Sequence, residues 1–347
     1  MPTSRALWQA VRRIGGGMLE PLGSIAAGAA ANLLTPAVLF FALGALAGWL
    51  KSDLTIPEQV AKTLALYLML CIGFKGGVEA RASGLTPDLI SAGGLGLVLS
   101  FLAPFAAYAA LRGFGALDRV TAAATAAHYG SVSVVTFAAG SEYLRAVGVE
   151  FGGYMAAVLA LMETPAILAA LLIAGSREGA AGGVRFKPTL WREVFLNGAA
   201  VVLVGSFIIG AVTGARGMER LDVFVSALFQ GALCLFLLDM GLVASRRLAE
   251  APKLNWRLIG FAIGWPLLSA AIALAASIAL KLSLGDASLM AVLAASASYI
   301  AAPAAMRIAL PKADAGVYLS LSLGVTFPFN LLVGIPLYHA FARLLYG

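Results

Sequence analysis

The sequence contains little charge for its length. Only 12% of its 347 residues are charged and 61% are hydrophobic, whereas soluble domains carry about 25% charged residues. A chain with half the usual charge has too little polar surface to cover a water-soluble globule of this size. The mean hydropathy of +0.92 agrees with this. The composition therefore predicts an all-α integral membrane protein.

Cysteine and histidine are also scarce. The two cysteines, Cys71 and Cys234, lie in apolar runs, which favours small buried side chains over a disulfide framework. The two histidines belong to no cluster with metal-ligand spacing. The net charge of +7 comes from Lys and Arg between apolar runs, a pattern of membrane orientation, so no nucleic-acid partner is expected. No phosphate-binding loop is present either, and we expect neither an enzyme nor an organic cofactor.

Ten apolar segments are long enough to cross a bilayer, which takes about 20 residues. The longest connection, 176–193, is Gly-rich at its start and basic, and it separates two sets of five spans. The first residues, 1–32, predict an amphipathic segment at the membrane interface, with a cleaved signal peptide as the less favoured alternative. The expected spans are 34–50, 57–78, 88–111, 119–140, 152–175, 194–215, 221–245, 256–281, 287–309 and 315–345.

The distribution of Lys and Arg predicts the orientation of these spans. When both termini are placed outside the cell, the cytoplasmic side holds the basic central loop 176–193 and most basic residues of the other loops. The sequence therefore predicts a multi-pass protein of the cell inner membrane with both termini outside.

The second half of the chain repeats features of the first. A shift of 168 residues places Gly73 on Gly241. Because five spans per repeat is an odd number, residues 33–175 and 194–347 must enter the membrane with opposite polarity. An inverted five-helix repeat is the architecture of many secondary transporters. The segments that this shift superposes are "LCIGF" (70–74) on "LDMGL" (238–242) and "AAHYGSV" (126–132) on "AASASYI" (294–300).

Polar residues inside two apolar spans predict broken helices. Hydroxyl side chains accompany Gly130 in "HYGSVSVVTFAAG" (128–140), and Pro303 removes a helical hydrogen bond in "SASYIAAPAAM" (296–306). Two opposed breaks that cross would bring helix N-termini together, and the partial positive charge there suits a small anion. Ordinary helix packing by small polar residues is the alternative. The candidate substrate-binding residues are Gly130, Ser131, Ser133, Thr136, Ser298, Tyr299, Ala301 and Ala302.

Five segments carry a likeness to a known family. They are "IPEQVAKTLALYLMLCIGFKGG" (56–77), "GSVSVVTFAA" (130–139), "YMAAVLALMETPAIL" (154–168), "AASASYIAAPAAMRIALPKADAGVYLSLSLGVTFP" (294–328) and "GIPLY" (334–338). In these segments, and in the same order along the chain, the sequence resembles the sodium-dependent bicarbonate transporters of cyanobacterial type.

The resemblance implies ten helices divided into a gate (the first, second, sixth and seventh) and a core. It implies two crossing broken helices that hold bicarbonate and sodium, and sodium-coupled symport of bicarbonate by alternating access. It also implies a trimer and, as a partner, a small trimeric signalling protein of PII type. The long loop that the family has between its halves is missing here, so the resemblance implies the PII-type partner less directly than it implies the fold.

The match to the family's ion site is partial. Ser133, Thr136, Ser296, Ser298 and Pro303 stand where the family has the same residue types. Glu163 stands where the family has an aspartate, so the acid is kept and its side chain is one methylene longer. The departures leave open a proton- or sodium-coupled carrier of an organic anion on the same scaffold. They are Val134 and Val135 for a glycine and a serine, Tyr299 for an aspartate, and Ala301 and Ala302 for a serine and a glycine.

Glu163 is the expected sodium ligand or proton carrier, because ionisable residues inside spans are costly and point to function. Ser296 and Ser298 would add hydroxyl oxygens, since hard cations prefer oxygen ligands. A membrane-embedded enzyme would need a paired acid and base, which Glu163 alone does not supply. A channel is the third class, and charges buried at a helix break favour a carrier over it.

Four further ionisable residues fall within spans. Lys75 and Glu79 are one turn apart, which allows an ion pair or extension of both side chains to the interface. The repeat also places Asp239 near the counterpart of Lys75, so a buried Lys75–Asp239 pair is a second hypothesis. His128, at the opening of the first break, is expected to be hydrogen-bonded within the structure rather than a metal ligand.

Overall fold

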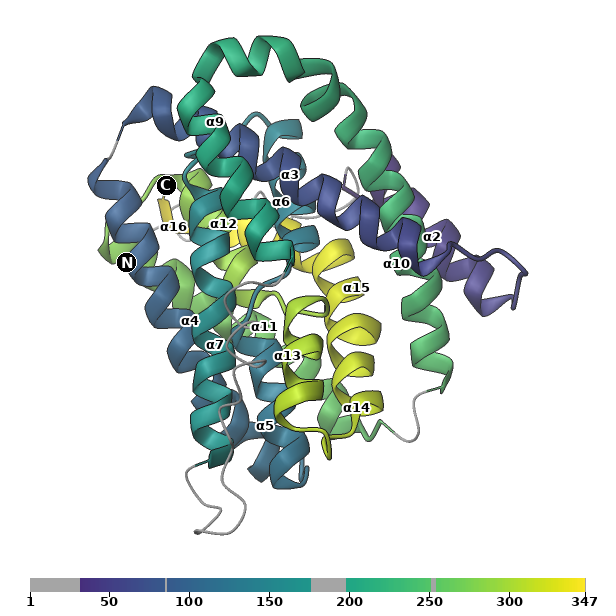
Figure 1. Cartoon of the computed structure of the whole chain (residues 1–347). Coiled ribbons are helices and arrows are strands. Elements are labelled where there is room, and N and C mark those ends of the chain that lie inside the picture. The colour runs from purple at the N-terminus through teal and green to yellow at the C-terminus, as the bar shows by residue number, and fades with distance from the viewer. Residues whose placement is uncertain (1–31, 85, 176–197, 251–253, 347) are drawn as a thin grey trace, which may run out of the picture.

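The computed structural model describes residues 32–84, 86–175, 198–250 and 254–346, and these are helical with no strand (Figure 1). The interfacial segment expected before residue 32 and the central loop 176–193 lie outside the described residues. Six of the described helices are long and apolar enough to cross a membrane. The all-α membrane class is therefore confirmed. These six are Glu58–Ala82, Pro87–Gly113, Met155–Ala174, Ala200–Ala249, Trp256–Ala279 and Ala315–Tyr346.

The helices of the first half follow the expected spans closely. The fourth span, expected over 119–140, is interrupted, because α5 (Arg119–Gly130) ends three residues before α6 (Val134–Ala146) begins. Asp118 caps α5, since its carboxylate accepts the amides of Val120 and Thr121 at 3.0 Å. The other helices of this half are α2 (Pro36–Trp49), α3 (Glu58–Ser83), α4 (Pro87–Gly113) and α7 (Met155–Gly175).

The sixth and seventh expected spans are joined by helical segments that meet at a kink at Gly214, so the short connection expected over 216–220 is itself helical. The chain runs through α9 (Gly198–Asp222), a π-helical segment (Val223–Ala227) and α10 (Leu228–Glu250), and Figure 1 shows this run arching over the molecule. The only non-helical backbone inside α9 is at Gly214 (φ 60°, ψ −147°). The charged residues after Gly214 include good helix formers, so the chain stays helical where its apolar pattern stops.

The second half ends in another interrupted span and a long helical run. α11 (Trp256–Ala279) leads to α12 (Leu284–Ala295), and five residues separate α12 from α13 (Ala301–Ala309). The last run alternates α-helical and π-helical turns. Its elements are α14 (Ala315–Leu319), η2 (Ser320–Thr326), α15 (Phe327–Phe329), η3 (Asn330–Gly334) and α16 (Ile335–Tyr346).

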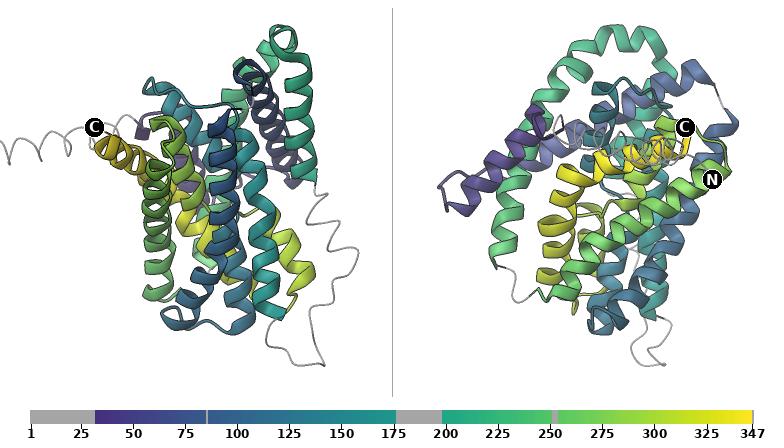
Figure 2. Two further views of the ribbon diagram at one scale, coloured as in Figure 1. Left: turned by 90° about the vertical axis from the view of Figure 1, so that its left-hand side faces the viewer. Right: turned by 180° about the vertical axis from the view of Figure 1, so that it is seen from behind.

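Two helix pairs, α3 with α9 and α2 with α10, pack backbone against backbone (Figure 2). A Cβ atom at Gly77 would overlap a backbone carbonyl of α9, and one at Gly44 would overlap a backbone carbonyl of α10. Gly73 and Gly241, which the internal repeat superposes, both lie in these contacts. In each pair, the second helix of one half therefore packs on the first helix of the other half.

Candidate functional site

The two helix interruptions lie in direct contact. The amide of Ser133 donates to Ser296 Oγ at 2.9 Å, and the amide of Ser298 donates to the carbonyl of His128 at 2.8 Å. Each bond joins residues more than 160 positions apart in the sequence. Backbone groups that a broken helix leaves unpaired are thus satisfied by the other break.

Serine side chains accept backbone amides at the starts of both helices. Ser133 Oγ accepts the amide of Thr136 at 3.1 Å at the start of α6, and Ser298 Oγ accepts the amide of Ala302 at 3.2 Å at the start of α13. Each of these hydroxyls keeps its own proton and a second lone pair. Because helix N-termini carry partial positive charge, two such starts at one place favour an anion.

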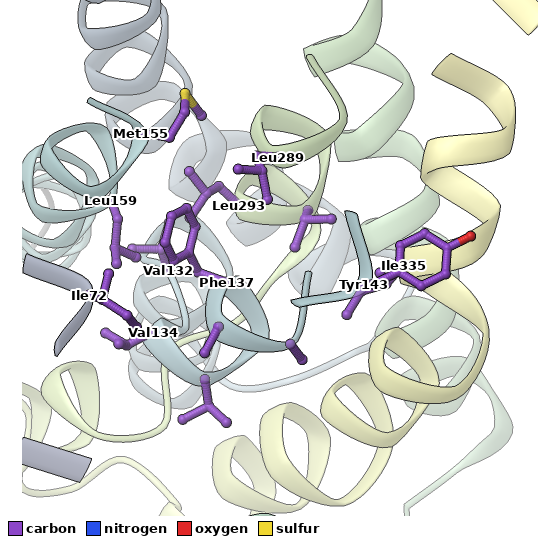
Figure 3. Close-up of a cluster of buried hydrophobic side chains, with 14 of the residues drawn as sticks. Ile72, Val132, Val134, Phe137, Tyr143, Met155, Leu159, Leu289, Leu293 and Ile335 are labelled. Carbon is purple, nitrogen blue, oxygen red and sulfur yellow. The ribbon is translucent and has the colours of Figure 1, made fainter. Parts of the chain in front are cut away.

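A small cavity lies where the two helices start. Its volume is about 10 Å³, room for the centre of one water-sized atom. Five of the residues predicted from the sequence share its lining, namely Ser133, Ser298, Tyr299, Ala301 and Glu163. The remaining lining residues are Met69, Val132, Val134 and Ile300. Val132 and Val134 also belong to the hydrophobic cluster that includes Ile72 and Phe137 (Figure 3).

Glu163 places a buried carboxylate at this cavity. Its side chain is 4% exposed, and Oε2 has no hydrogen-bond partner among the described residues. An unpaired polar atom at such depth is costly, and a cation would relieve that cost. Carboxylate and hydroxyl oxygens from Glu163, Ser133 and Ser298 form a donor set that suits a hard cation. The residues present therefore fit sodium.

Tyr299 contributes the remaining polar group of the lining. Its hydroxyl oxygen is buried and makes no hydrogen bond of good geometry with a described residue, although it lies close to Ser133. Its ring packs edge-on against Phe327 at 5.3 Å between centroids. A neutral phenol at this position can donate to an anion, which the acid that the family carries there cannot do when it is ionised.

Two candidates of the first break support the site from outside the cavity. A Cβ atom at Gly130 would overlap the ring of Pro104, so this glycine permits close packing of α5 on α4. Ser131 Oγ donates to the carbonyl of Glu163 at 3.4 Å, in the turn that precedes Pro165. These contacts hold the break against α4 and α7.

The other candidates outside the lining act through their backbone or as linkers. Thr136 and Ala302 supply the amides that the two serine hydroxyls accept. Ser296 Oγ donates to the carbonyl of Leu293 at 2.8 Å while it accepts the amide of Ser133. This hydroxyl keeps a second lone pair, but Ser296 is not among the residues that line the cavity, so its expected role as a sodium ligand stays a prediction.

The expected Lys75–Asp239 ion pair is not formed. Lys75 Nζ lies 4.8 Å from the ring centroid of Phe229, in a cation–π contact with α10. Asp239 is ten residues further along α10, about 15 Å away at 1.5 Å per residue. The expected internal repeat related positions along the sequence, and it could not show this axial offset between the helices.

His128 is held within the structure, as expected from the sequence. Its Nδ1 donates to the carbonyl of Ala124 at 2.7 Å, and its ring lies against Tyr318 with 4.4 Å between centroids. The side chain is fully buried. No group of three or more His, Cys, Asp or Glu residues suited to a metal is found among the described residues.

Asn330 was missed by the sequence analysis and supports the second break. Its Nδ2 donates to the carbonyl of Ala295, the last residue of α12, at 2.8 Å. Its Oδ1 accepts the hydroxyl of Tyr338 at 2.7 Å. A lone asparagine in the apolar run "TFPFNLL" was the available signal, since a buried amide in a membrane span needs partners.

Asp286 was also missed, and it fixes the start of α12. Its carboxylate accepts the amide of Gly152 at 2.7 Å, the hydroxyl of Tyr154 at 2.8 Å and the hydroxyl of Ser283 at 2.6 Å. These bonds attach the start of the second interrupted span to the segment before α7. The signal was a Ser-x-x-Asp capping pattern at 283–286.

Comparison with known families accounts for this arrangement. A family model described as the Na+-dependent bicarbonate transporter superfamily matches residues 36–343, which include both breaks and Glu163. The chain belongs to this superfamily. Membership in this transporter superfamily agrees with the multi-pass helical structure and implies a transporter rather than an enzyme. No curated protein matches the chain at a significant level.

Proposed function

We propose that the protein is a secondary active transporter that moves bicarbonate together with sodium by alternating access. One observation carries this proposal: the Glu163 carboxylate, whose Oε2 has no hydrogen-bond partner among the described residues, shares a cavity with the starts of α6 and α13. Membership in the superfamily supplies the identity of the ions.

The charges at the cavity favour binding of an anion and a cation together. The helix starts of α6 and α13 attract the anion, whereas the Glu163 carboxylate repels it and attracts sodium. Sodium would offset Glu163 and so remove the repulsion, which makes the two ions cooperative. The free hydroxyl protons of Ser133 and Ser298 then remain to donate to the oxygens of bicarbonate.

The position and size of the cavity support alternating access. A space of about 10 Å³ fits one water-sized atom and is too small for the four heavy atoms of bicarbonate. Met69 of α3 forms one wall, and the two breaks and α7 form the others. We infer that α3 and its packed partners move relative to the breaks and thereby open the cavity.

An inverted repeat with two crossing broken helices is part of the same proposal. The exchange of partners, with α3 on α9 and α2 on α10, is what two interlocked halves related by such a repeat would show. We retain the trimer, the PII-type regulator and the inner-membrane orientation with both termini outside as predictions.

A carrier of an organic anion is the second candidate, and Val134 and Tyr299 favour it. They give the cavity an apolar wall and a phenol where the resemblance implies a glycine and an acid. In that case Glu163 would carry a proton or sodium, and an organic carboxylate would replace bicarbonate.

Uptake into liposomes distinguishes these two functions. Purified protein should accumulate radiolabelled bicarbonate when an inward sodium gradient is imposed, and an inward proton gradient alone should have no effect. Glu163→Gln should abolish the sodium stimulation, whereas Glu58→Gln, at an exposed carboxylate paired with Lys62, should leave it unchanged. Uptake driven only by protons, or of organic acids in preference to bicarbonate, would support the second candidate.

A further inference from the structure

A second cavity lies between α3, α6 and the segment that enters α7. Its volume is about 20 Å³. Four of its lining side chains are polar, namely Lys75, Glu79, Ser141 and Arg145, and the others are apolar or glycine. It shares no residue with the cavity at the two breaks.

The two cavities follow the same seam between α3 and α6. We call the cavity at the two breaks the central cavity. On α3, Met69 lines the central cavity, and Ile72 and Lys75 line the second cavity. On α6, Val134 lines the central cavity and Phe137 lines the second. Residues three apart lie on one face of a helix, so the seam is continuous. Ile72 and Phe137, which both belong to the hydrophobic cluster of Figure 3, line the end of the second cavity that is nearest the breaks.

Two hydrogen-bond donors face the second cavity without an acceptor. Lys75 forms no ion pair or hydrogen bond with a described residue, and its contact with Phe229 leaves its three N–H groups unpaired. Ser141 is 4% exposed, and its Oγ has no hydrogen-bond partner in the part of the chain that the structure describes. A serine inside a helix commonly donates to the carbonyl four residues before it, and Ser141 does not.

One cation of the lining, Lys75, is available to a negative ligand. Two cations, Lys75 and Arg145, face one carboxylate, Glu79, which lies against the backbone of Gly153. Arg145 is already engaged, because it pairs with Glu142 at 2.8 Å. Lys75 is therefore the charged group that is left to bind a ligand.

We propose that this cavity is a second binding site, for a small oxyanion, in which the Lys75 ammonium and the Ser141 hydroxyl donate hydrogen bonds to it. An oxyanion supplies both the negative charge and the acceptor oxygens that these donors lack. The cavity must widen to admit such an anion, as the one at the breaks must for bicarbonate, and the flexible Lys75 side chain in its lining can shift while its ammonium stays in contact with the anion. The position on the seam makes this a waiting site on the path to the breaks. The proposal rests on the proposed function only in taking bicarbonate as the anion.

Protection of Lys75 from chemical modification tests this site without transport. The full-length protein in detergent is methylated with formaldehyde and borohydride, and the rate at each lysine is followed by mass spectrometry. Saturating bicarbonate should slow methylation of Lys75 at least about fivefold and leave the exposed Lys62 of the same helix unchanged. Nitrate, an oxyanion that forms no carbamate with amines, should also protect, and chloride at equal ionic strength should not.

Substitutions sharpen the test. Ser141→Ala should raise the anion concentration for half protection by roughly tenfold, because it removes a hydrogen bond to a charged group. Thr63→Ala, at an exposed hydroxyl of α3, should not change it.

The proposal is overturned if no anion protects, if chloride protects equally, or if Lys75 does not react even without anion. It is also overturned if Ser298→Ala removes protection while Ser141→Ala does not. Retained protection without sodium-driven uptake would contradict the proposed function instead.

Discussion

The glycine-packed helix pairs and the two breaks are held together in different ways. In α3–α9 and α2–α10, the contacts are backbone against backbone, with glycines at Gly77 and Gly44 that leave no room for a methyl group. At the breaks, hydrogen bonds from Ser133 and Ser298 join the two segments. Close packing makes a rigid unit, whereas hydrogen bonds to an irregular backbone leave polar groups that a ligand can use. The structure thus contains a closely packed unit and a unit with polar groups at irregular backbone, and the proposed function needs the first to move as a body and the second to bind.

The largest loss of stability should come from Gly77→Ala, a substitution in one of the glycine-packed helix pairs. The new methyl group would overlap the carbonyl of Phe207, so α3 and α9 must separate, and we expect a loss of about 3 kcal/mol of stability. Gly205→Ala is the matched control, because it lies on α9 with nothing within 4 Å of the new methyl group. Thermal unfolding in detergent measures both. Equal stability of the two variants would contradict the role given to the glycines.

A smaller loss, about 2 kcal/mol, is expected for Asn330→Ala, because it leaves the carbonyl of Ala295 and the hydroxyl of Tyr338 unpaired. Tyr338→Phe removes only one of these bonds and should lower the unfolding temperature less. If Tyr338→Phe were the more harmful, the bond from Asn330 to the second break would not be the important one.

The smallest effect on stability should come from the capping serines. Ser133→Ala should cost about 1 kcal/mol, as should Thr86→Ala, which removes the cap of α4 far from the breaks. The two variants should differ in anion binding, because only Ser133 lines the central cavity. We expect bicarbonate affinity, measured by calorimetry, to fall roughly tenfold in Ser133→Ala alone. The same fall in Thr86→Ala would indicate an indirect effect of stability.

The sequence was sufficient to locate both breaks but not to place them to the residue. Pro303 lacks an amide hydrogen, and a cluster of hydroxyls after Gly130 is unusual in an apolar span, so each interruption had a local cause. Gly130 itself turned out to end α5 and pack on Pro104. The helix across 216–222 was missed because hydropathy reports where a chain leaves lipid and does not report where a helix ends.

The roles of individual hydroxyls depended on tertiary contacts that the sequence does not encode locally. Ser296 and Ser298 looked equivalent, yet Ser296 links the two breaks while Ser298 lines the cavity. The supposed Lys75–Asp239 pair failed for a similar reason, because the part of α10 that faces Lys75 is the turn of Phe229, which no local pattern indicates. Glu163 was identifiable from the sequence, since an acid inside a span is rare.

Reciprocal binding of the two ions tests the central claim most directly. The affinity of the purified protein for bicarbonate is measured by calorimetry with sodium and with an equal concentration of a large organic cation. If Glu163 binds sodium beside the anion at the two breaks, sodium should raise bicarbonate affinity at least about tenfold in the wild type and not in Glu163→Gln. Equal affinity with and without sodium in the wild type, or an unchanged sodium effect in Glu163→Gln, would contradict it.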